Sequence, residues 1–256
     1  MSVVDAIVLG VIQGLTEFLP ISSSGHLALA EQLLGMKDLD RNLAVTLLLH
    51  LASLVAVFVY YRKRLPELFT TRRRESAYLV LATLPIVVVG ALLDKQIEKA
   101  HGLPVLICAC LVVNGAFVYV SDRFGRGTQP LAEAPWWKAL IVGLAQAVRI
   151  PGLSRSGSTI GTGWLVGLDR ADAVRFSFLL SIPAVLGAVV WKARKLDFAA
   201  LDLPLIPTLL ALAITFVLSL LSIRVVETLA LGRRWLLFAA YSAVVGVAGL
   251  AWFLSR

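Results

Sequence analysis

Two short polar stretches decide how this chain can fold, and they read Gln13-Gly-Leu-Thr-Glu17-Phe-Leu-Pro-Ile-Ser-Ser-Ser-Gly-His26 and Arg149-Ile-Pro-Gly-Leu-Ser-Arg-Ser-Gly-Ser-Thr159. Most of the remaining chain is apolar. Burying a carboxylate, a guanidinium and several hydroxyls at the depth of a bilayer costs several kcal/mol unless these groups meet each other, water or a ligand. We therefore expect the two stretches to form the functional site.

The composition indicates an integral membrane protein. Of the 256 residues, 59% are hydrophobic and only 16% are charged, against about 25% charged in a soluble domain, and the mean hydropathy is +0.85. A transmembrane helix needs an apolar run of about 17 to 25 residues. Such runs predict spans near 44–61, 76–93, 104–120, 176–193, 205–223 and 235–254. We expect one all-α, multi-pass membrane domain over residues 1–256, with no removable signal peptide at its start.

The basic residues are explained by membrane topology rather than by nucleic acid. The formal net charge is +8, but Lys and Arg cluster at the ends of the predicted spans, as in Arg62-Lys63-Arg64 and Arg72-Arg73-Arg74. Basic residues there set the orientation and contact anionic lipid headgroups. We expect membrane lipids as partners and no nucleic acid.

An internal repeat relates residues 1–128 to residues 135–256. A shift of 133 residues aligns Gly10-Val-Ile-Gln13 with Gly143-Leu-Ala-Gln146. Each half starts with a Gly-x-x-Gln helix, breaks at a turn rich in Pro and Ser, restarts, and continues with three long apolar segments. Repeats of this kind are typical of transporter-like membrane folds.

The segments beside the polar stretches are too short to cross a bilayer of about 30 Å. We interpret 6–19 with 27–35, and 139–148 with 158–168, as two re-entrant hairpins. A hairpin plus three crossings is an odd number of passes, so the second repeat should be inverted relative to the first. The alternative is that each turn only kinks an ordinary helix, since Pro and Gly are tolerated in membrane helices.

The inverted arrangement predicts both an orientation and a site. The side that holds loops 62–75, 121–138, 169–175 and 224–234 carries 14 Lys and Arg, and the other side carries 8. The positive-inside rule then places both termini outside the cytoplasm. Hairpins entering from opposite faces would bring Ser22–His26 against Ser154–Thr159, with His26 and Arg155 in one cavity.

The second polar stretch has the composition of a phosphate site. Arg155 is a planar cation with five donors, flanked by hydroxyls and by glycines that allow close backbone approach. A helix restarting after Gly157 would add N-terminal amides and the positive end of its dipole. Helix capping alone would also explain the serines, but an arginine within the membrane favours a ligand.

The first polar stretch offers the groups used in phosphoryl transfer. Glu17 supplies a carboxylate, Ser22–Ser24 supply hydroxyls, and His26 has an imidazole that titrates near neutral pH. Gln13 and Glu17 lie four residues apart and so share one helix face. There they could hold a divalent cation against a diphosphate. We interpret His50 and His101 as packing residues.

At these residues the chain resembles the undecaprenyl-diphosphate phosphatase family, also known as the bacitracin-resistance proteins. Gln13-x-x-x-Glu17 fits the family's Glu/Gln-x-x-x-Glu motif, and Phe18-Leu-Pro-Ile-Ser-Ser-Ser-Gly-His26 fits its continuation. Pro151-Gly-Leu-Ser-Arg-Ser-Gly-Ser-Thr159 fits its P-G-x-S-R-S-x-x-T motif. Weaker similarity at Phe176–Pro183 and Leu84-Pro85 extends the resemblance over nearly the whole chain.

The resemblance implies interdigitated inverted repeats and hydrolysis of undecaprenyl diphosphate to the monophosphate and phosphate. This reaction recycles the lipid carrier of cell-wall synthesis. It further implies Mg²⁺ or Ca²⁺, and a site in the cytoplasmic (inner) membrane that opens outward, to the periplasm or cell exterior.

The resemblance also assigns roles to the motif residues. Arg155 would bind the diphosphate, Ser23 would be the nucleophile or a phosphate ligand, and His26 would shuttle a proton. Glu17 would coordinate the metal or activate Ser23 or water. The supporting substrate-binding residues would be Gln13, Ser22, Ser24, Ser154, Ser156 and Thr159.

The sequence departs from the family's pattern at two places, and it also allows one alternative function. Gln146 and Pro151 are one residue closer than is usual in the family, which would shorten or unwind the preceding helix, and Arg149 stands where small or apolar residues are usual. A transporter that flips the lipid carrier would need the same anion site but neither a nucleophile nor a proton shuttle. The small residues Gly246-Val-Ala-Gly249 allow close helix packing, either within the chain or in a homodimer.

Overall fold

The computed structural model describes residues 2–36, 38–196, 203–232 and 234–255, and this part of the chain is all-helical. It contains eleven α-helices and one 3₁₀ turn. The elements are α1 (Val3–Thr16), α2 (Ser23–Leu33), α3 (Leu39–Tyr60), α4 (Leu65–Phe69), α5 (Arg73–His101), α6 (Pro104–Phe124), η1 (Leu131–Glu133), α7 (Trp136–Ala147), α8 (Arg155–Leu165), α9 (Arg170–Ala193), α10 (Leu205–Leu231) and α11 (Leu236–Leu254).

The six predicted spans are confirmed as helices long and apolar enough to cross a membrane. They are α3, α5, α6, α9, α10 and α11. Helix α5 extends beyond the predicted 76–93 to His101. The added part includes the polar segment Asp94–Lys99, so the apolar run that defined the prediction ends before the helix does. Large apolar side chains on these helices point outward, for example Leu92 (72% exposed) and Val244 (67% exposed). The protein is therefore a multi-pass membrane protein.

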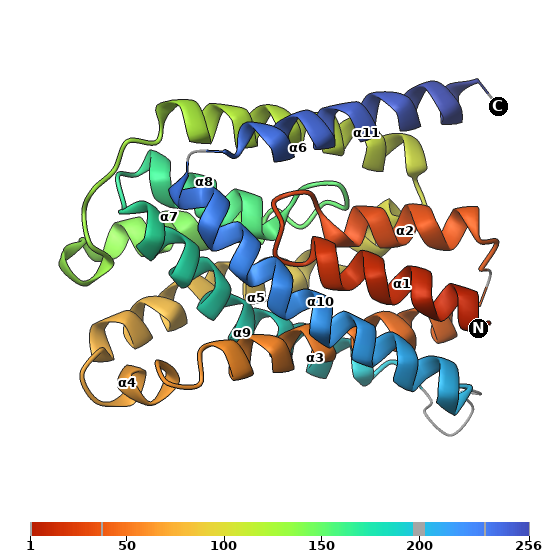
Figure 1. The fold of residues 1–256 in the computed structure, drawn as a ribbon, viewed down its shortest axis with the longest axis horizontal. Helices are drawn as coiled ribbons and strands as arrows, with labels where there is room; N and C mark the ends of the chain where they lie inside the picture. The colour runs from red at the N-terminus through yellow and green to blue at the C-terminus, as the bar shows by residue number, and fades with distance from the viewer. Residues whose placement is uncertain (1, 37, 197–202, 233, 256) are drawn as a thin grey trace.

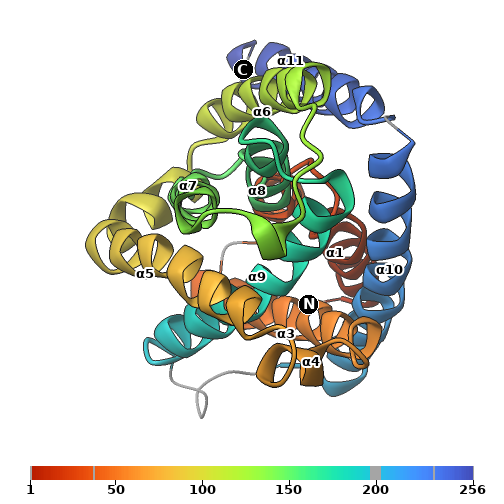
Figure 2. The same ribbon diagram turned by 90° about the vertical axis from the view of Figure 1, so that its left-hand side faces the viewer.

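Four shorter helices form two hairpins inside the ring of long helices. In Figure 1, α1 and α2 reach the right-hand end of the bundle, and α7 and α8 reach its left-hand end. The two connecting turns lie near the middle. Figure 2, a view along the bundle, shows α1 and α8 enclosed by longer helices. With 11 to 14 residues each, the four helices are shorter than the roughly 20 residues of a complete crossing.

The second helix of each hairpin begins earlier than predicted. Helix α2 begins at Ser23 rather than near 27, and α8 begins at Arg155, so the expected restart after Gly157 is wrong. The reason is capping. The Oγ of Ser22 accepts from the N–H of Gly25, and the Oγ of Ser154 accepts from the N–H of Gly157. A serine that satisfies a free amide in this way starts the helix at the next residue.

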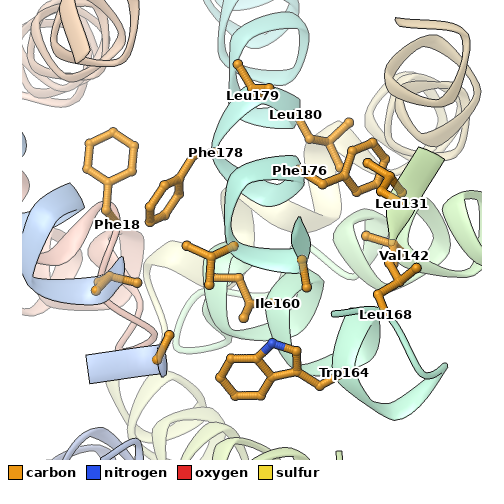
Figure 3. Close-up of a cluster of buried hydrophobic side chains, with 14 of the residues drawn as sticks. Phe18, Leu131, Val142, Ile160, Trp164, Leu168, Phe176, Phe178, Leu179 and Leu180 are labelled. Carbon is orange, nitrogen blue, oxygen red and sulfur yellow. The ribbon is translucent and has the colours of Figure 1, made fainter. Parts of the chain in front are cut away.

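Aromatic side chains pack both hairpins against the long helices (Figure 3). Phe18, just after α1, packs edge-to-face on Phe178 of α9, with ring centroids 5.3 Å apart. Trp164 of α8 is fully buried between Trp235, at 4.4 Å, and the guanidinium of Arg170, at 3.7 Å. Aromatic pairs in such edge-to-face arrangements are worth about 0.5–1.5 kcal/mol each beyond the area that they bury.

Small residues let the helices that flank the hairpins approach closely. A Cβ on Gly246 of α11 would lie 2.7 Å from the carbonyl oxygen of Cys108 on α6, and one on Gly249 would lie 2.4 Å from the Cys108 sulfur. The Gly246–Gly249 patch thus packs within the chain. Dimerisation stays a prediction without support from this patch.

We predict that Gly246→Val lowers the melting temperature of the protein in detergent, because the added side chain forces α11 away from α6 at a cost of about 1–3 kcal/mol. Gly187→Val is the matched control, since nothing lies within 4 Å of a Cβ at that helical glycine. Equal melting temperatures for the two variants would contradict the packing described here.

Candidate active site

The turns of the two hairpins contact each other directly, as the sequence predicts. The backbone N–H of Gly152 donates to the Oγ of Ser22 at 3.1 Å, and the Oγ of Ser156 donates to the carbonyl of Leu19 at 3.0 Å. Gly152 has φ +99°, and a Cβ there would lie 2.4 Å from the carbonyl oxygen of Ile107. Only glycine fits this position, because it needs both a left-handed backbone and close approach to α6.

Asn114 of α6 joins the two turns, although the sequence analysis did not identify it. Its Nδ2 donates to the carbonyl of Pro20 at 2.8 Å, and its Oδ1 accepts from the N–H of Ser154 at 2.9 Å. The side chain is 1% exposed. The available signal was an amide within an apolar span, which usually marks a functional or structural contact.

Ser22 holds a strained backbone at the centre of this contact. It has φ +71°, the one left-handed non-glycine residue in the described ranges. Such a conformation costs about 1–3 kcal/mol and persists where the surroundings impose it. Here the Oγ of Ser22 accepts from two amides, and its carbonyl accepts from the N–H and the Nδ1 of His26.

The Glu17 carboxylate lies between the two hairpins and binds residues from both. Its Oε1 accepts from a guanidinium nitrogen of Arg155 at 2.8 Å, and its Oε2 accepts from the Oγ of Ser23 at 2.6 Å. Gln13 Nε2 also donates to Oε2, at 3.1 Å. The side chain of Glu17 is 5% exposed and that of Arg155 is 19% exposed. Three of the predicted site residues therefore meet Glu17 in one buried cluster.

Ser23 and Arg155 occupy equivalent positions, since each is the first residue of its helix. The N-termini of α2 and α8 therefore both open toward the Glu17 cluster. The first amides of a helix and the positive end of its dipole attract anions. Together with the guanidinium of Arg155, they form an electropositive region around a single carboxylate.

The other predicted hydroxyls are engaged with the protein. Ser24 lies 3.5 Å from the Oγ of Ser22. Ser154, Ser156 and Thr159 are at most 2% exposed, and Thr159 Oγ1 lies 2.6 Å from the Oγ of Ser177 on α9. In this structure Ser154, Ser156 and Thr159 fasten α8 to its neighbours, and Ser24 lies beside Ser22 in the first turn.

His26 makes its hydrogen bonds outside the Glu17 cluster. Its Nδ1 lies 2.8 Å from the carbonyl of Ser22 and its Nε2 lies 3.1 Å from the hydroxyl of Tyr241 on α11. Among the described residues, no hydrogen bond or ion pair joins His26 to Ser23 or Arg155.

His50, interpreted from the sequence as a packing residue, lies beside Glu17. Its Nε2 is 3.6 Å from Glu17 Oε2, and its Nδ1 is 2.7 Å from the carbonyl of Thr46. Its leucine neighbours gave no sign of this contact, because only tertiary structure brings α3 beside α1.

Gln13 and Glu17 fit a hard divalent cation. Gln13 Oε1 is a buried acceptor without a hydrogen-bond partner, on the amide whose Nε2 donates to the carboxylate of Glu17. Oxygen donors of this kind suit Mg²⁺ and Ca²⁺. The described residues hold no cluster of three or more Asp, Glu, His or Cys side chains suited to a metal. A cation here would therefore need additional oxygen ligands from a bound phosphate.

The two departures in the second stretch have visible consequences. Helix α7 ends at Ala147, directly after Gln146, whose Nε2 donates to the carbonyl of Ala82 on α5 at 3.1 Å. Arg149 follows in the turn and is exposed. The helix before the arginine motif is thus short, as the reduced spacing predicts.

Comparisons with known proteins agree on one family. The family model described as "Bacitracin resistance protein BacA" matches residues 6–248. Undecaprenyl-diphosphatase 1 of Shouchella clausii is 40% identical, over 96% of this chain and 95% of that protein. The undecaprenyl-diphosphatase of Alcanivorax borkumensis is also 40% identical, over 97% and 98%, and that of Moorella thermoacetica is 36% identical over the full length of both.

We predict that Asn114→Leu lowers the stability of the protein by about 1–3 kcal/mol, because it leaves the Pro20 carbonyl and the Ser154 amide buried without partners. Melting temperature and resistance to proteolysis in detergent measure the effect. Val113→Leu, at an exposed position one residue away, is the control. If the two variants melt alike, Asn114 does not join the turns.

Proposed function

The chain belongs to the bacitracin resistance protein BacA family, and from this premise we propose how it works as an undecaprenyl-diphosphatase. It hydrolyses undecaprenyl diphosphate to undecaprenyl phosphate and inorganic phosphate. The reaction returns the lipid carrier to cell-wall synthesis and confers resistance to bacitracin.

One observation carries the proposed mechanism. The carboxylate of Glu17 accepts a hydrogen bond from a candidate nucleophile, Ser23, and from a candidate phosphate ligand, Arg155, on opposite hairpins. A serine hydroxyl is a weak nucleophile until a base removes its proton. Glu17, at 2.6 Å, is that base.

In the first step, Ser23 Oγ passes its proton to Glu17 and attacks the terminal phosphorus. The new O–P bond forms as the bond from this phosphorus to the bridging oxygen breaks, and undecaprenyl phosphate leaves. Protonation removes the negative charge of Glu17, so Arg155 loses its ion-pair partner just as the phosphoryl group gains charge. The guanidinium and the N-terminal amides of α2 and α8 then stabilise that group.

In the second step, water attacks the phosphoserine. The P–Oγ bond breaks, the proton held by Glu17 returns to Ser23 Oγ, and the hydrogens of water leave with the phosphate. Glu17 regains its charge and pairs again with Arg155. The enzyme thus returns to the arrangement seen in the structure.

A divalent cation, Mg²⁺ or Ca²⁺, completes this proposal. Gln13 Oε1 would hold it together with phosphate oxygens, and the carboxylate of Glu17 would join them while it is ionised, before it takes the Ser23 proton. When bound, it neutralises charge on the diphosphate. Ser22, Ser24, Ser154, Ser156 and Thr159 support the site by fixing the two turns.

We further propose that the two hairpins are re-entrant and belong to inverted repeats, residues 1–128 and 135–256. The support is that the hairpins enter from opposite ends of the bundle and that their turns meet between them (Figure 1). The excess of Lys and Arg on the loop side that includes 62–75 favours a cytoplasmic location for that side. The site would then open to the outer face of the inner membrane.

The contact between Ser23 and Glu17 favours an enzyme over a lipid transporter. A transporter that binds the same lipid phosphate needs the cation Arg155 and a change of access. It has no use for a serine hydroxyl on a buried carboxylate.

We predict that Arg155→Ala lowers phosphate release from undecaprenyl diphosphate at least 100-fold, because one electrostatic contact of this kind is worth about 10²–10³ in rate. Purified protein in detergent with Mg²⁺ or Ca²⁺ and a colorimetric phosphate assay measures it. Arg62→Ala, at an exposed loop position, is the control and should keep the activity of the unaltered protein. Equal slow release by the unaltered protein and Arg155→Ala would overturn the enzyme assignment.

A further inference from the structure

The hydrogen bonds of His26 fix its tautomer. A carbonyl oxygen only accepts, so His26 Nδ1, at 2.8 Å from the carbonyl of Ser22, must carry a hydrogen. In the neutral ring, Nε2 then has a free lone pair. That nitrogen lies 3.1 Å from the hydroxyl of Tyr241, which therefore donates to it. The two rings are stacked, with centroids 5.6 Å apart and an interplanar angle of 15°.

Tyr241 makes this contact from a helix that otherwise has little to do with the site. It lies on α11, a candidate membrane span, and is 43% exposed. Tyr119 on the adjacent helix α6 is similarly exposed, at 49%, but no hydrogen bond of its hydroxyl is present in the described part of the chain. An exposed tyrosine on these helices therefore does not need a protein partner, whereas Tyr241 both stacks on His26 and contacts its Nε2.

The Glu17 cluster leaves His26 free for a different task. Ser23 already has Glu17 as its base, and His26 Nε2 points to Tyr241 instead. In the proposed reaction Glu17 gives no proton to the departing lipid phosphate, so a separate acid can protonate it as it gains charge. His26 can supply that proton only through the tyrosine hydroxyl that covers its Nε2.

We propose, on the basis of the phosphatase activity proposed above, that Tyr241 positions His26 and relays its proton to the departing lipid phosphate. When His26 is protonated, its hydrogen bond with Tyr241 reverses, so that Nε2 donates to the Tyr241 oxygen and the Tyr241 hydroxyl is free to donate to a phosphate oxygen. Nε2 then gives its proton to the Tyr241 oxygen while the hydroxyl gives its own proton to the phosphate oxygen. His26 ends neutral, Tyr241 is unchanged, and a proton taken up from the solvent returns His26 to its protonated form. Undecaprenyl phosphate thus leaves singly protonated.

The test is the change of Tyr241 to Phe, which keeps the ring stacking and removes only the hydroxyl. We expect kcat for phosphate release to fall about tenfold or more, with KM little changed, because a proton-transfer contact is lost while the diphosphate ligands remain. Tyr119→Phe is the matched control and should keep the unaltered kcat. The melting temperature of Tyr241→Phe should equal that of the unaltered protein.

A double-mutant cycle with His26→Asn separates a relay from a purely structural role. Asn can still donate to the Ser22 carbonyl but has no equivalent of Nε2. If Tyr241 acts through His26, adding Tyr241→Phe to His26→Asn should cause no further loss of kcat. Unchanged kcat in Tyr241→Phe, or losses that multiply in the double variant, would overturn the relay.

The same series separates the relay from the phosphatase proposal. If the unaltered protein releases phosphate in a manner that depends on Arg155, while Tyr241→Phe matches it, only the relay fails. If Arg155→Ala releases phosphate as the unaltered protein does, the proposed function itself fails.

Discussion

The buried carboxylate of Glu17 is the group on which the rest of the site depends. An ionised carboxylate in an apolar bundle is stable only with partners, and removing one partner of a buried ion pair costs about 3–5 kcal/mol. Its partners, Ser23 from the first hairpin and Arg155 from the second, lie 2.6 and 2.8 Å away. The carboxylate can therefore be buried only when the two hairpins meet. Folding and assembly of the site are the same event.

The polar residues of the two turns divide between structure and chemistry. Ser22 and Ser154 cap the short helices, Ser22 and Ser156 tie one turn to the other, and Asn114 joins both turns to α6. This framework leaves Ser23 and Arg155, each at the start of a helix, directed at Glu17. Ser22, with its strained backbone, lies where these hydrogen bonds converge. The hydrogen bonds therefore offset the cost of its left-handed conformation.

The sequence predicted the features that local patterns encode. Length and hydropathy located the six spans, and the Pro- and Ser-rich stretches located the two turns and the residues around Glu17. It placed the starts of α2 and α8 too late, because the capping by Ser22 and Ser154 depends on backbone geometry. Asn114, His50 and Tyr241 were missed as site neighbours, since each reaches the turns from another helix. Such contacts become visible only when the helices are placed in space.

The most direct test of the account is to look for phosphate on Ser23. Rapid acid quenching of the enzyme during turnover of undecaprenyl diphosphate, followed by peptide mass spectrometry, would capture a covalent intermediate. The account predicts phosphoserine at position 23, formed fast enough to lie on the reaction path and absent in Ser23→Ala. Full turnover by Ser23→Ala, with no phosphorylated peptide in the unaltered enzyme, would contradict it and favour direct attack by water.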